Sequence, residues 1–451
     1  MQHNMVTATM TKYFKESIIT LVVVLSRLPF IFNSLGSDLD SWREVYTGKV
    51  WHESHIYNVS RFPGYPFSEF LYSFIYDYPY WSINLLTVLF TVGCCIYFFR
   101  IMEFLTVKFS LLISIVLSFI PVIYMNSTVA MEYNWSLFFL LGSVYYTLNK
   151  KLWIAALFFG LMVSTRFNNI IFLPAFLFLA YSYTGRDLKK TLRFLFTSLL
   201  FACIFFLPVI LKYGRHFIQS SGASEVSFPT LLSLGTLHIY GALGITALLL
   251  TFIIQFFTDG FQKAKNLCKD HFTIFCTAMI AFNLIFFIKF PLEAGYLIPS
   301  IPFVLILLQN LLNHTLIKVV LYTLLLSPFF IHINTKKVDL KGIVFVNEDY
   351  EDQELDYCKN LIRNIEKLSK DKQEIFHVGN YSEQVLLMSN FDKEKNIKIV
   401  KKLTSKDKEE IIHKKYPLYY INTVDGTIEN NETHMLEHYG KLFYKDFELN
   451  K

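Results

Sequence analysis

The stretch SLGSDLDSWREVYTGKVWHESHIYNVSRFPGYPFSEF, residues 34–70, begins directly after the first apolar run of the chain. It opens with three carboxylates, Asp38, Asp40 and Glu44, and continues into an aromatic and proline-rich patch that contains Arg61. Charged groups at the mouth of a membrane-embedded segment are costly and usually mark a functional site. A loop of this length is usually functional or disordered. Because its many aromatic residues disfavour disorder, we expect a folded loop with a function.

The composition of the whole chain is typical of a membrane protein. Of its 451 residues, 53% are hydrophobic and 17% aromatic, and the mean hydropathy is +0.38. Charge is distributed unevenly, because residues 336–451 hold 42 of the 78 charged side chains. Elsewhere the excess of basic residues lies in short loops between apolar runs, a pattern that predicts no nucleic-acid partner. The six cysteines form no CxxC and no metal-like spacing, so neither a disulfide framework nor a zinc site is expected.

The apolar runs predict an α-helical polytopic membrane protein. A bilayer core needs roughly 20 apolar residues per helix. On that basis the sequence predicts eleven transmembrane helices, at residues 15–33, 82–101, 109–126, 130–148, 152–166, 168–184, 194–212, 232–257, 272–290, 295–313 and 316–334. No small-residue cleavage site follows the first run, which we therefore interpret as a retained helix rather than a signal peptide.

The basic loops predict which side of the membrane each segment faces. The loops NKK (149–151) and GRDLKK (185–190) both belong in the cytoplasm under the positive-inside rule, so the chain crosses twice between them. A cytoplasmic N-terminus and eleven spans give a transmembrane domain over residues 1–334, with an external juxtamembrane loop at 34–81. The Lys-, Asn-, Ile- and Phe-rich composition favours a bacterial inner (plasma) membrane, and hence the cell envelope.

Residues 335–451 predict a small, soluble, extracytoplasmic α/β domain. The runs GIVFVNE (342–348), EIFHVGN (374–380), NIKIVKK (396–402) and PLYYINT (417–423) have β-rich compositions. Polar helical stretches alternate with them, namely ELDYCKNLIRNIEKLS (354–369) and KDKEEIIHKK (406–415). No glycine-rich phosphate loop or catalytic arrangement is visible there, so an accessory role is favoured.

Five segments bring charged residues to the predicted outer face. The first external loop adds His52, His55 and Glu69 to the residues named above, and the later segments add Glu132, Arg166, Lys289 and Glu293. Within the first loop, Trp42, Val45 and Tyr46 are spaced as on an amphipathic helix that lies in the membrane interface. Ser41, with Glu44 three residues on, resembles a capping box. Asp40 would then lie at a helix N-terminus, whose dipole favours its ionised form.

These residue types suit one kind of chemistry in particular. An outward-facing carboxylate can act as a general base toward a hydroxyl or an amine. Arginines beside it can hold a phosphate leaving group through paired hydrogen bonds. No nucleotide-binding motif is present. The combination favours glycosyl transfer, of a hexosyl or pentosyl group, from a polyprenyl-phosphate-linked sugar donor to a lipid, glycan or protein acceptor outside the membrane.

Four segments resemble the GT-C superfamily of integral membrane glycosyltransferases, which includes protein O-mannosyltransferases and bacterial aminoarabinose transferases. The first external loop, "DSW…Y…RFPGYPFSEFL", is similar to the acid and the Arg/Pro-rich stretch of that superfamily. The other three segments are MEYNWSLFFLL (131–141), GLMVSTRFNNIIFLPAFLFL (160–179) and KFPLEAGYLIPSIPFVLIL (289–307). Their order and spacing cover most of residues 15–310. The resemblance implies a GT-C-like fold.

The resemblance also implies roles for individual residues. Asp40 holds the position of the catalytic base, with Asp38 as the alternative. The predicted substrate-binding residues are Arg61, Glu132, Arg166, Lys289, Glu293 and Tyr296. Two departures stand out. Gly295 occupies a position where the superfamily often has Arg, and the acids are split as Asp38-Leu39-Asp40. A D-x-D pair can recruit Mg²⁺ or Mn²⁺, but not every branch requires a metal, so no cofactor is predicted with certainty.

Two other function classes compete with this one. A transporter or flippase of lipid-linked saccharides would favour internal repeats and charges near the bilayer midplane, and the sequence has neither. A polymerase or ligase of lipid-linked saccharides also works outside with arginines, but it normally lacks the acid of the first loop and the RFPGYP stretch. A non-catalytic scaffold would leave the one-sided acids and arginines unexplained.

Overall fold

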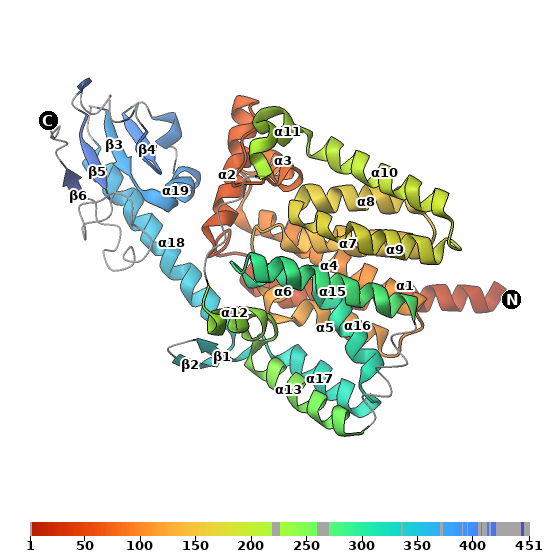
Figure 1. Ribbon diagram of the computed structural model, residues 1–451. Coiled ribbons are helices and arrows are strands. Elements are labelled where there is room, and N and C mark those ends of the chain that lie inside the picture. The colour runs from red at the N-terminus through yellow and green to blue at the C-terminus, as the bar shows by residue number, and fades with distance from the viewer. Residues whose placement is uncertain are drawn as a thin grey trace.

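The structure is a computed structural model that describes most of the chain and is mainly helical (Figure 1). It describes residues 2–218, 226–258, 270–334, 337–369, 373–389, 391–394, 396–404, 407, 413–414, 416–420 and 443–445. Most of the predicted helical stretch 406–415 lies outside the described residues.

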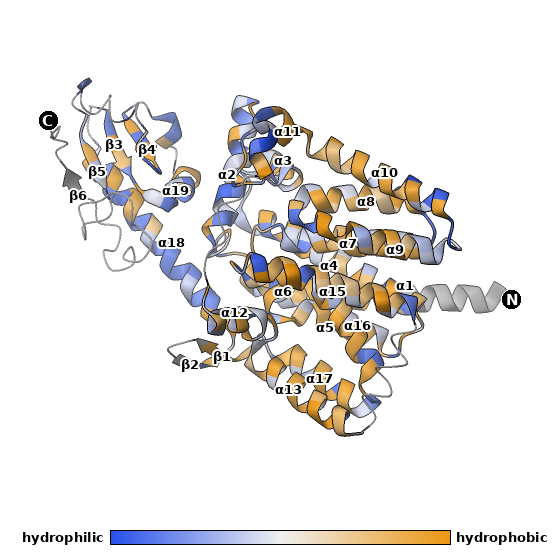
Figure 2. Cartoon of the chain, in the orientation of Figure 1, coloured by the Kyte–Doolittle hydropathy of each residue, from blue (hydrophilic) through white to orange (hydrophobic). Residues whose placement is uncertain are grey.

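The apolar part of the chain consists of helices of unequal length. Their bounds are α1 (Gln2–Arg27), α4 (Tyr80–Phe104), α5 (Ser110–Phe119), α6 (Pro121–Met125), α7 (Tyr133–Leu148), α8 (Leu152–Thr165), α9 (Leu173–Tyr183), α10 (Leu188–Phe205), α11 (Leu207–Tyr213), α12 (Phe228–Gly235), α13 (Leu237–Thr258), α15 (His271–Lys289), α16 (Ile301–Leu311) and α17 (His314–Leu326). Two 3-10 segments, η2 (Phe167–Phe172) and η4 (Ala294–Ser300), lead into α9 and α16. Apolar residues dominate these helices, whereas α2 and the C-terminal segment are more polar (Figure 2).

The helices indicate an integral membrane protein, with fewer full-length spans than the eleven predicted. Among the described residues, four helical segments are long and apolar enough to cross a membrane, and a fifth does so if α10 and the segment after it, bent by 60°, form one span. Proline explains one difference, because the predicted span 109–126 divides into α5 and α6 at Pro121. The predicted span 316–334 is helical only as far as Leu326, the end of α17, and its last five residues form β1 (Phe330–Asn334).

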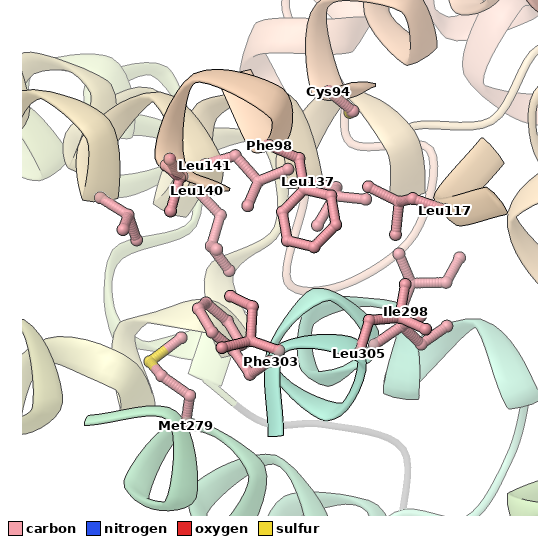
Figure 3. Packing of buried hydrophobic residues seen from close by; sticks show 14 of the residues in the cluster. Cys94, Phe98, Leu117, Leu137, Leu140, Leu141, Met279, Ile298, Phe303 and Leu305 are labelled. Carbon is pink, nitrogen blue, oxygen red and sulfur yellow. The ribbon is translucent and has the colours of Figure 1, made fainter. Parts of the chain in front are cut away.

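A continuous apolar core joins helices that are far apart in the sequence. Phe98 of α4, Leu117 of α5, Leu137 of α7 and Ile298 of η4 are all fully buried in it (Figure 3). Glycines permit close helix approaches around this core. A Cβ atom on Gly160 of α8, for example, would lie 2.5 Å from the side chain of Phe201 on α10. This packing holds the ends of α7, α8 and η4 in fixed relative positions, and those ends carry the polar residues described below.

The loop 34–81, predicted to be external, folds into two helices, α2 (Leu39–Ser54) and α3 (Pro66–Ile75), as expected of a folded rather than a disordered segment. The two helices approach closely at Gly48, where a Cβ atom would lie 2.7 Å from the backbone of Tyr72. Backbone hydrogen bonding attaches the loop to the helical core, because Ala130 N donates to Leu35 O at 2.8 Å. Residues 34–81 are therefore part of the folded protein and do not lie apart from it.

Among its described residues, the C-terminal segment, which runs from residue 335, contains a small sheet and the helices α18 and α19. An antiparallel pair of strands, β1 and β2 (Lys337–Lys341), precedes the long α18 (Ile343–Leu368). The sheet has the order β4-β3-β5-β6, from β3 (Glu374–His377), β4 (Ile397–Val400), β5 (Leu418–Tyr420) and β6 (Phe443–Lys445), and α19 (Ser382–Met388) follows β3. Strand β3 pairs in parallel with β4 and β5, and β5 pairs antiparallel with β6.

Three of the four predicted β-rich runs coincide with β3, β4 and β5, and the stretch 354–369 is helical as predicted. The run GIVFVNE (342–348) was predicted as a strand and is wrong, because it forms the first turns of α18. Its apolar residues instead place Val344 in a cluster with Phe119 and Tyr124. Tertiary packing thus outweighs the β propensity of Ile and Val.

Candidate functional site

The acidic residues at the beginning of the first loop lie at the start of α2, but the N-cap residue of this helix differs from the predicted one. Asp38 is the N-cap residue, and its Oδ1 accepts a hydrogen bond from Asp40 N at 2.9 Å. The predicted capping box at Ser41 is wrong, because Ser41 Oγ donates to Asp38 O at 2.6 Å. Asp38 caps the helix because aspartate accepts from the free N–H groups of a first turn. Asp40 lies in that first turn, where the helix dipole favours a negative charge.

The apolar face of α2 was predicted to lie in the membrane interface. In the structure, this face packs against other parts of the protein. Trp42 and Val45 are buried in a cluster with Leu35, Tyr72 and Trp135. Trp42 Nε1 also donates to Gly36 O at 3.0 Å, which satisfies the indole in the interior. The helix that carries the two aspartates is therefore fixed on one side by the apolar core.

A buried carboxylate, Glu69, shapes the aromatic part of the loop. Its Oε2 accepts from Tyr57 Oη at 2.5 Å, and its Oε1 accepts from both Ser60 N and Ser60 Oγ at 2.7 Å. A further hydrogen bond comes from Tyr65 N at 3.3 Å. Burial raises the pKa of Glu69. Glu69 was predicted to lie among the charged residues of the outer face. In the structure, its hydrogen bonds hold the loop that precedes α3 and contains Arg61.

Two arginines share one carboxylate at the centre of the site. Glu132 Oε1 accepts a hydrogen bond from Arg61 Nη2 at 3.1 Å and from Arg166 Nη1 at 2.5 Å. Arg61 Nε also lies 3.1 Å from Asp40 Oδ2, and Arg61 Nη1 lies 3.2 Å from Glu44 Oε1. Glu132 is completely buried and Arg166 is 4% exposed. The ends of three segments, at the first loop, the start of α7 and the end of α8, thus converge on one polar cluster.

Tyrosines surround the second arginine. The guanidinium of Arg166 lies 3.7 Å from the ring centroid of Tyr133, 5.1 Å from that of Tyr296 and 5.8 Å from that of Tyr65. Cation–π contacts of this kind hold a guanidinium group over the ring faces. Tyr133 also donates its hydroxyl hydrogen to Glu293 Oε2. Tyr296 and Glu293 were predicted as site residues, and both belong to this cluster.

The departure at Gly295 has a steric explanation. A Cβ atom built on Gly295 would lie 2.6 Å from Cε1 of Tyr133, so no side chain fits there without displacing that ring. The arginine that the superfamily often carries at this position cannot be accommodated in the present arrangement. Tyr133 fills the space instead.

Three carboxylates lie beside the arginines and next to a cavity. One oxygen each of Asp38, Asp40 and Glu293 lies within 4.8 Å of the others. A cavity of about 250 Å³ is lined by residues that include Asp38, Glu293, Tyr133, Asn126 and His238. Oxygen ligands in such a set suit a hard divalent cation such as Mg²⁺ or Mn²⁺.

Two acids of the loop besides Glu69 have raised pKa values. Asp38 is exposed at the surface, yet loss of hydration beside the surrounding protein, together with the charges of Asp40 and Glu293, raises the pKa of Asp38 to about 6. Burial and the neighbouring Glu132 raise the pKa of Glu44 well above its usual range. Both shifts favour the protonated form, since they arise from lost hydration and from like charges.

Several predicted residues do not join the cluster. Lys289 is exposed in the last turn of α15, and its Nζ lies 5.6 Å from the ring centroid of Phe290. His52 packs against the ring of Tyr76 at 5.4 Å, and His55 ends α2 in the left-handed conformation. Among the described residues, no hydrogen bond or ion pair connects these three side chains with Arg61 or Arg166.

Sequence reasoning missed three members of the cluster. Tyr65 and Tyr133 contact Arg166, and Arg43 Nη1 forms a 2.7 Å ion pair with Asp40 Oδ1. The spacing of Arg43 three residues after Asp40 is a signal that could have found it, because such residues are neighbours on a helix. The tyrosines gave no such signal, since aromatic residues are abundant throughout the chain.

Comparison with known proteins yields similarity at the level of structure alone. No family model and no curated protein matches the sequence. Among solved structures, the chain is similar to the Archaeoglobus fulgidus oligosaccharyltransferase tethered to an acceptor peptide with the NVT sequon. The TM-score is 0.48 and the sequence identity 10%, and the match covers 83% of this chain and 63% of that chain. The same enzyme in complex with Zn and sulfate gives a TM-score of 0.46 and 11% identity, over 83% of this chain and 61% of that chain.

The chain is also similar to ArnT from Cupriavidus metallidurans in the apo state, with a TM-score of 0.47 and 11% identity over 92% of this chain and 93% of that chain. It therefore spans less than two thirds of the archaeal enzyme and nearly the full length of ArnT. Both proteins are GT-C glycosyltransferases, the superfamily that the sequence resembles. At such low identity, the likeness assigns no activity to this chain.

Proposed function

We propose that this protein is a membrane glycosyltransferase that moves a sugar from a polyprenyl-phosphate donor to an acceptor at the outer face of the membrane. The observation that carries the proposal is the convergence of Arg61 and Arg166 on Glu132 beside the carboxylates of Asp38 and Asp40. Arginines that can bind a phosphate thus lie next to groups that can accept a proton. The apolar helices below them offer a surface for the lipid part of the donor.

Arg61 and Arg166 are the proposed ligands of the donor phosphate. Glu132 orients both guanidinium groups through one oxygen. The remaining nitrogens of Arg61 face Asp40 Oδ2 at 3.1 Å and Glu44 Oε1 at 3.2 Å, and phosphate oxygens of the donor would take the place of these carboxylates. The pair would bind the phosphate in the ground state and stabilise its charge as the sugar departs.

The transfer step is a substitution at the anomeric carbon of the donor sugar. The bond between that carbon and the phosphate oxygen breaks, and a bond to the acceptor oxygen or nitrogen forms. The acceptor proton passes to a carboxylate of the protein. The leaving group is polyprenyl phosphate, whose new negative charge lies beside Arg61 and Arg166. No oxidant or reductant takes part.

We assign the proton acceptor to the pair Asp38 and Asp40. Asp40 is the residue that the family resemblance favours, and its ion pair with Arg61 keeps it next to the proposed phosphate site. Asp38 lines the 250 Å³ cavity and its pKa is raised to about 6, which suits a general base near neutral pH. Replacement of each residue separately decides between them.

A divalent cation would be held by Asp38, Asp40 and Glu293 if the enzyme uses one. Mg²⁺ or Mn²⁺ in that position would neutralise negative charge on the donor phosphate. The protein's own residues supply orientation and the proton acceptor. Addition of a chelator in the assay below tests this requirement directly.

The decisive experiment incubates the purified protein with a panel of polyprenyl-phosphate sugars and measures release of polyprenyl phosphate. Acceptor-dependent release with formation of a glycosylated product supports the proposal. A transporter or flippase would instead move the intact donor between leaflets of a vesicle without releasing polyprenyl phosphate. A polymerase or ligase would consume lipid-linked saccharides but would keep its activity after loss of the acid in the first loop.

A further inference from the structure

The C-terminal segment contacts α2 directly, the helix that carries Asp40. Apolar residues form part of the contact, since Leu387 and Met388 at the end of α19 pack against the cluster of Trp42 and Val45. Leu39, at the start of α2, packs in turn against the apolar core of the C-terminal segment. Figure 1 shows α19 on the side of the C-terminal segment that faces α2. The segment is therefore docked on the proposed site.

Two polar links accompany this apolar contact. Lys49, near the middle of α2, forms a 2.7 Å ion pair with Asp392, and its ammonium group also lies 3.4 Å from Leu386 O. Arg43, one and a half turns earlier, donates from Nη2 to Asn380 Oδ1 at 2.9 Å. Its Nε lies 4.0 Å from Glu383 Oε1. The ion pair of Lys49 connects the C-terminal segment with α2 alone. Arg43, by contrast, also contacts Asp40 in the proposed site.

Arg43 joins the C-terminal segment to Asp40 through one rigid group. Its Nη1 lies 2.7 Å from Asp40 Oδ1, while its Nη2 is bound to Asn380. The guanidinium group is planar and its donors point in fixed directions, so fixing Nη2 also fixes the direction of Nη1. Asp40 Oδ2 faces Arg61 on the other side. When Arg61 binds a donor phosphate, Arg43 is the cation that still holds Asp40 in place.

We propose that Arg43 is a positioning residue, and that Asn380 of the C-terminal segment sets the orientation of Asp40 through it. The C-terminal segment is then a working part of the active site rather than an accessory. This inference rests on the proposed function, because its effect is seen in the rate of sugar transfer. Asn380 need not touch either substrate.

The test compares Asn380→Ala with Asp392→Asn in the full-length protein. Asn380→Ala removes the acceptor of the hydrogen bond from Arg43 Nη2 and should lower kcat about tenfold or more, since small displacements of a catalytic group are costly. The KM values for donor and acceptor should change less than about twofold. Asp392→Asn weakens the other link and should leave kcat within about twofold of wild type. Asn380→Asp keeps an acceptor oxygen for Arg43 and should restore most of the rate.

A double-mutant cycle separates this role from general destabilisation. If Asn380 acts through Arg43, the double variant Arg43→Ala/Asn380→Ala should be no slower than Arg43→Ala alone. Additive losses, an unchanged kcat in Asn380→Ala, or an equal loss in Asp392→Asn would each overturn the inference. Wild-type protein that releases no polyprenyl phosphate would instead count against the proposed function. Thermal unfolding of every variant is measured in parallel, and a loss of kcat that tracks the melting temperature would also overturn the positioning role.

Discussion

Glu132 and Arg166 meet where the start of α7 lies beside the end of α8, and Arg166 Nη1 lies 2.5 Å from Glu132 Oε1 there. Both side chains are almost completely inaccessible to solvent. A buried pair of this kind pays for its desolvation only if its remaining atoms find partners. Glu132 Oε1 also accepts from Arg61, and the protonated form of Glu44 shares a hydrogen bond with Glu132. The two arginines and the two carboxyl groups therefore form one connected network, in which a charged ligand would compete with the carboxylates for Arg61.

Replacement of the first-loop acids tests the proton acceptor. Asp40→Asn should lower sugar transfer by about 100-fold or more, because a general base contributes about that much to a rate. Membrane insertion and abundance should stay near wild type, since the side chain keeps its shape. Asp38→Asn is the matched control, because Asp38 is the N-cap of the helix whose first turn contains Asp40. Normal transfer by Asp40→Asn together with loss in Asp38→Asn would assign the proton to Asp38, and normal transfer by both would remove the pair from the mechanism.

The pH dependence of the rate provides an independent reading of Asp38. Because the pKa of Asp38 is raised to about 6, its base form is lost as the pH falls through that value. If Asp38 takes the proton, kcat/KM should decline below about pH 6 and the decline should vanish in Asp38→Asn.

The same shift has a consequence for stability. A carboxyl whose pKa is higher in the folded state stabilises the protein in its protonated form, so this contribution is lost as the pH rises through about 6. Asp38→Asn, which is neutral at all pH values, should therefore melt at a higher temperature than wild type at pH 7.5 and at nearly the same temperature at about pH 3, below the pKa of an unfolded aspartate. A lower melting temperature for the variant at pH 7.5 would contradict the raised pKa.

Arg166→Ala should weaken use of the donor more than use of the acceptor. The variant removes a buried cation that holds Glu132 and contacts Tyr133, and hydrogen bonds to charged groups contribute about 1.5–3 kcal/mol each. We therefore expect the KM for the polyprenyl-phosphate sugar to rise about tenfold or more. Arg100→Ala is a suitable control, because Arg100 forms its ion pair with Glu16, away from the cluster. Equal changes in donor and acceptor dependence would contradict the assignment.

Gly295→Ala tests whether the Tyr133 ring must remain in place. The added methyl group would lie 2.6 Å from that ring, so the ring must move away from Arg166 and Glu293. Overpacking of this kind costs about 1–3 kcal/mol, and transfer should fall with it. Gly235→Ala is the matched control, since the nearest atom to a Cβ there is 3.7 Å away. Unchanged donor use in Gly295→Ala would show that the ring position is unimportant.

The sequence by itself was sufficient for the broad class of the molecule and for most members of the polar cluster around Arg61 and Arg166. Apolar runs are local features, so a membrane protein with a charged first loop follows from composition and length. The order of four short motifs pointed to Arg61, Glu132, Arg166 and Tyr296, which the structure brings into one cluster. Lys289 belongs to the same motifs, yet it lies exposed at the end of α15.

Only the tertiary structure decided which side chains meet, because contacts between Arg61 and Glu132, or Arg43 and Asn380, join residues about 70 and 340 positions apart. Local sequence patterns carry no information on contacts between residues that are so far apart along the chain. The same reason explains the errors at residues 342–348 and at the cap of α2. At residues 342–348, packing against distant side chains outweighed the local β propensity. At the start of α2, a hydrogen bond from Ser41 to the backbone replaced the predicted capping box.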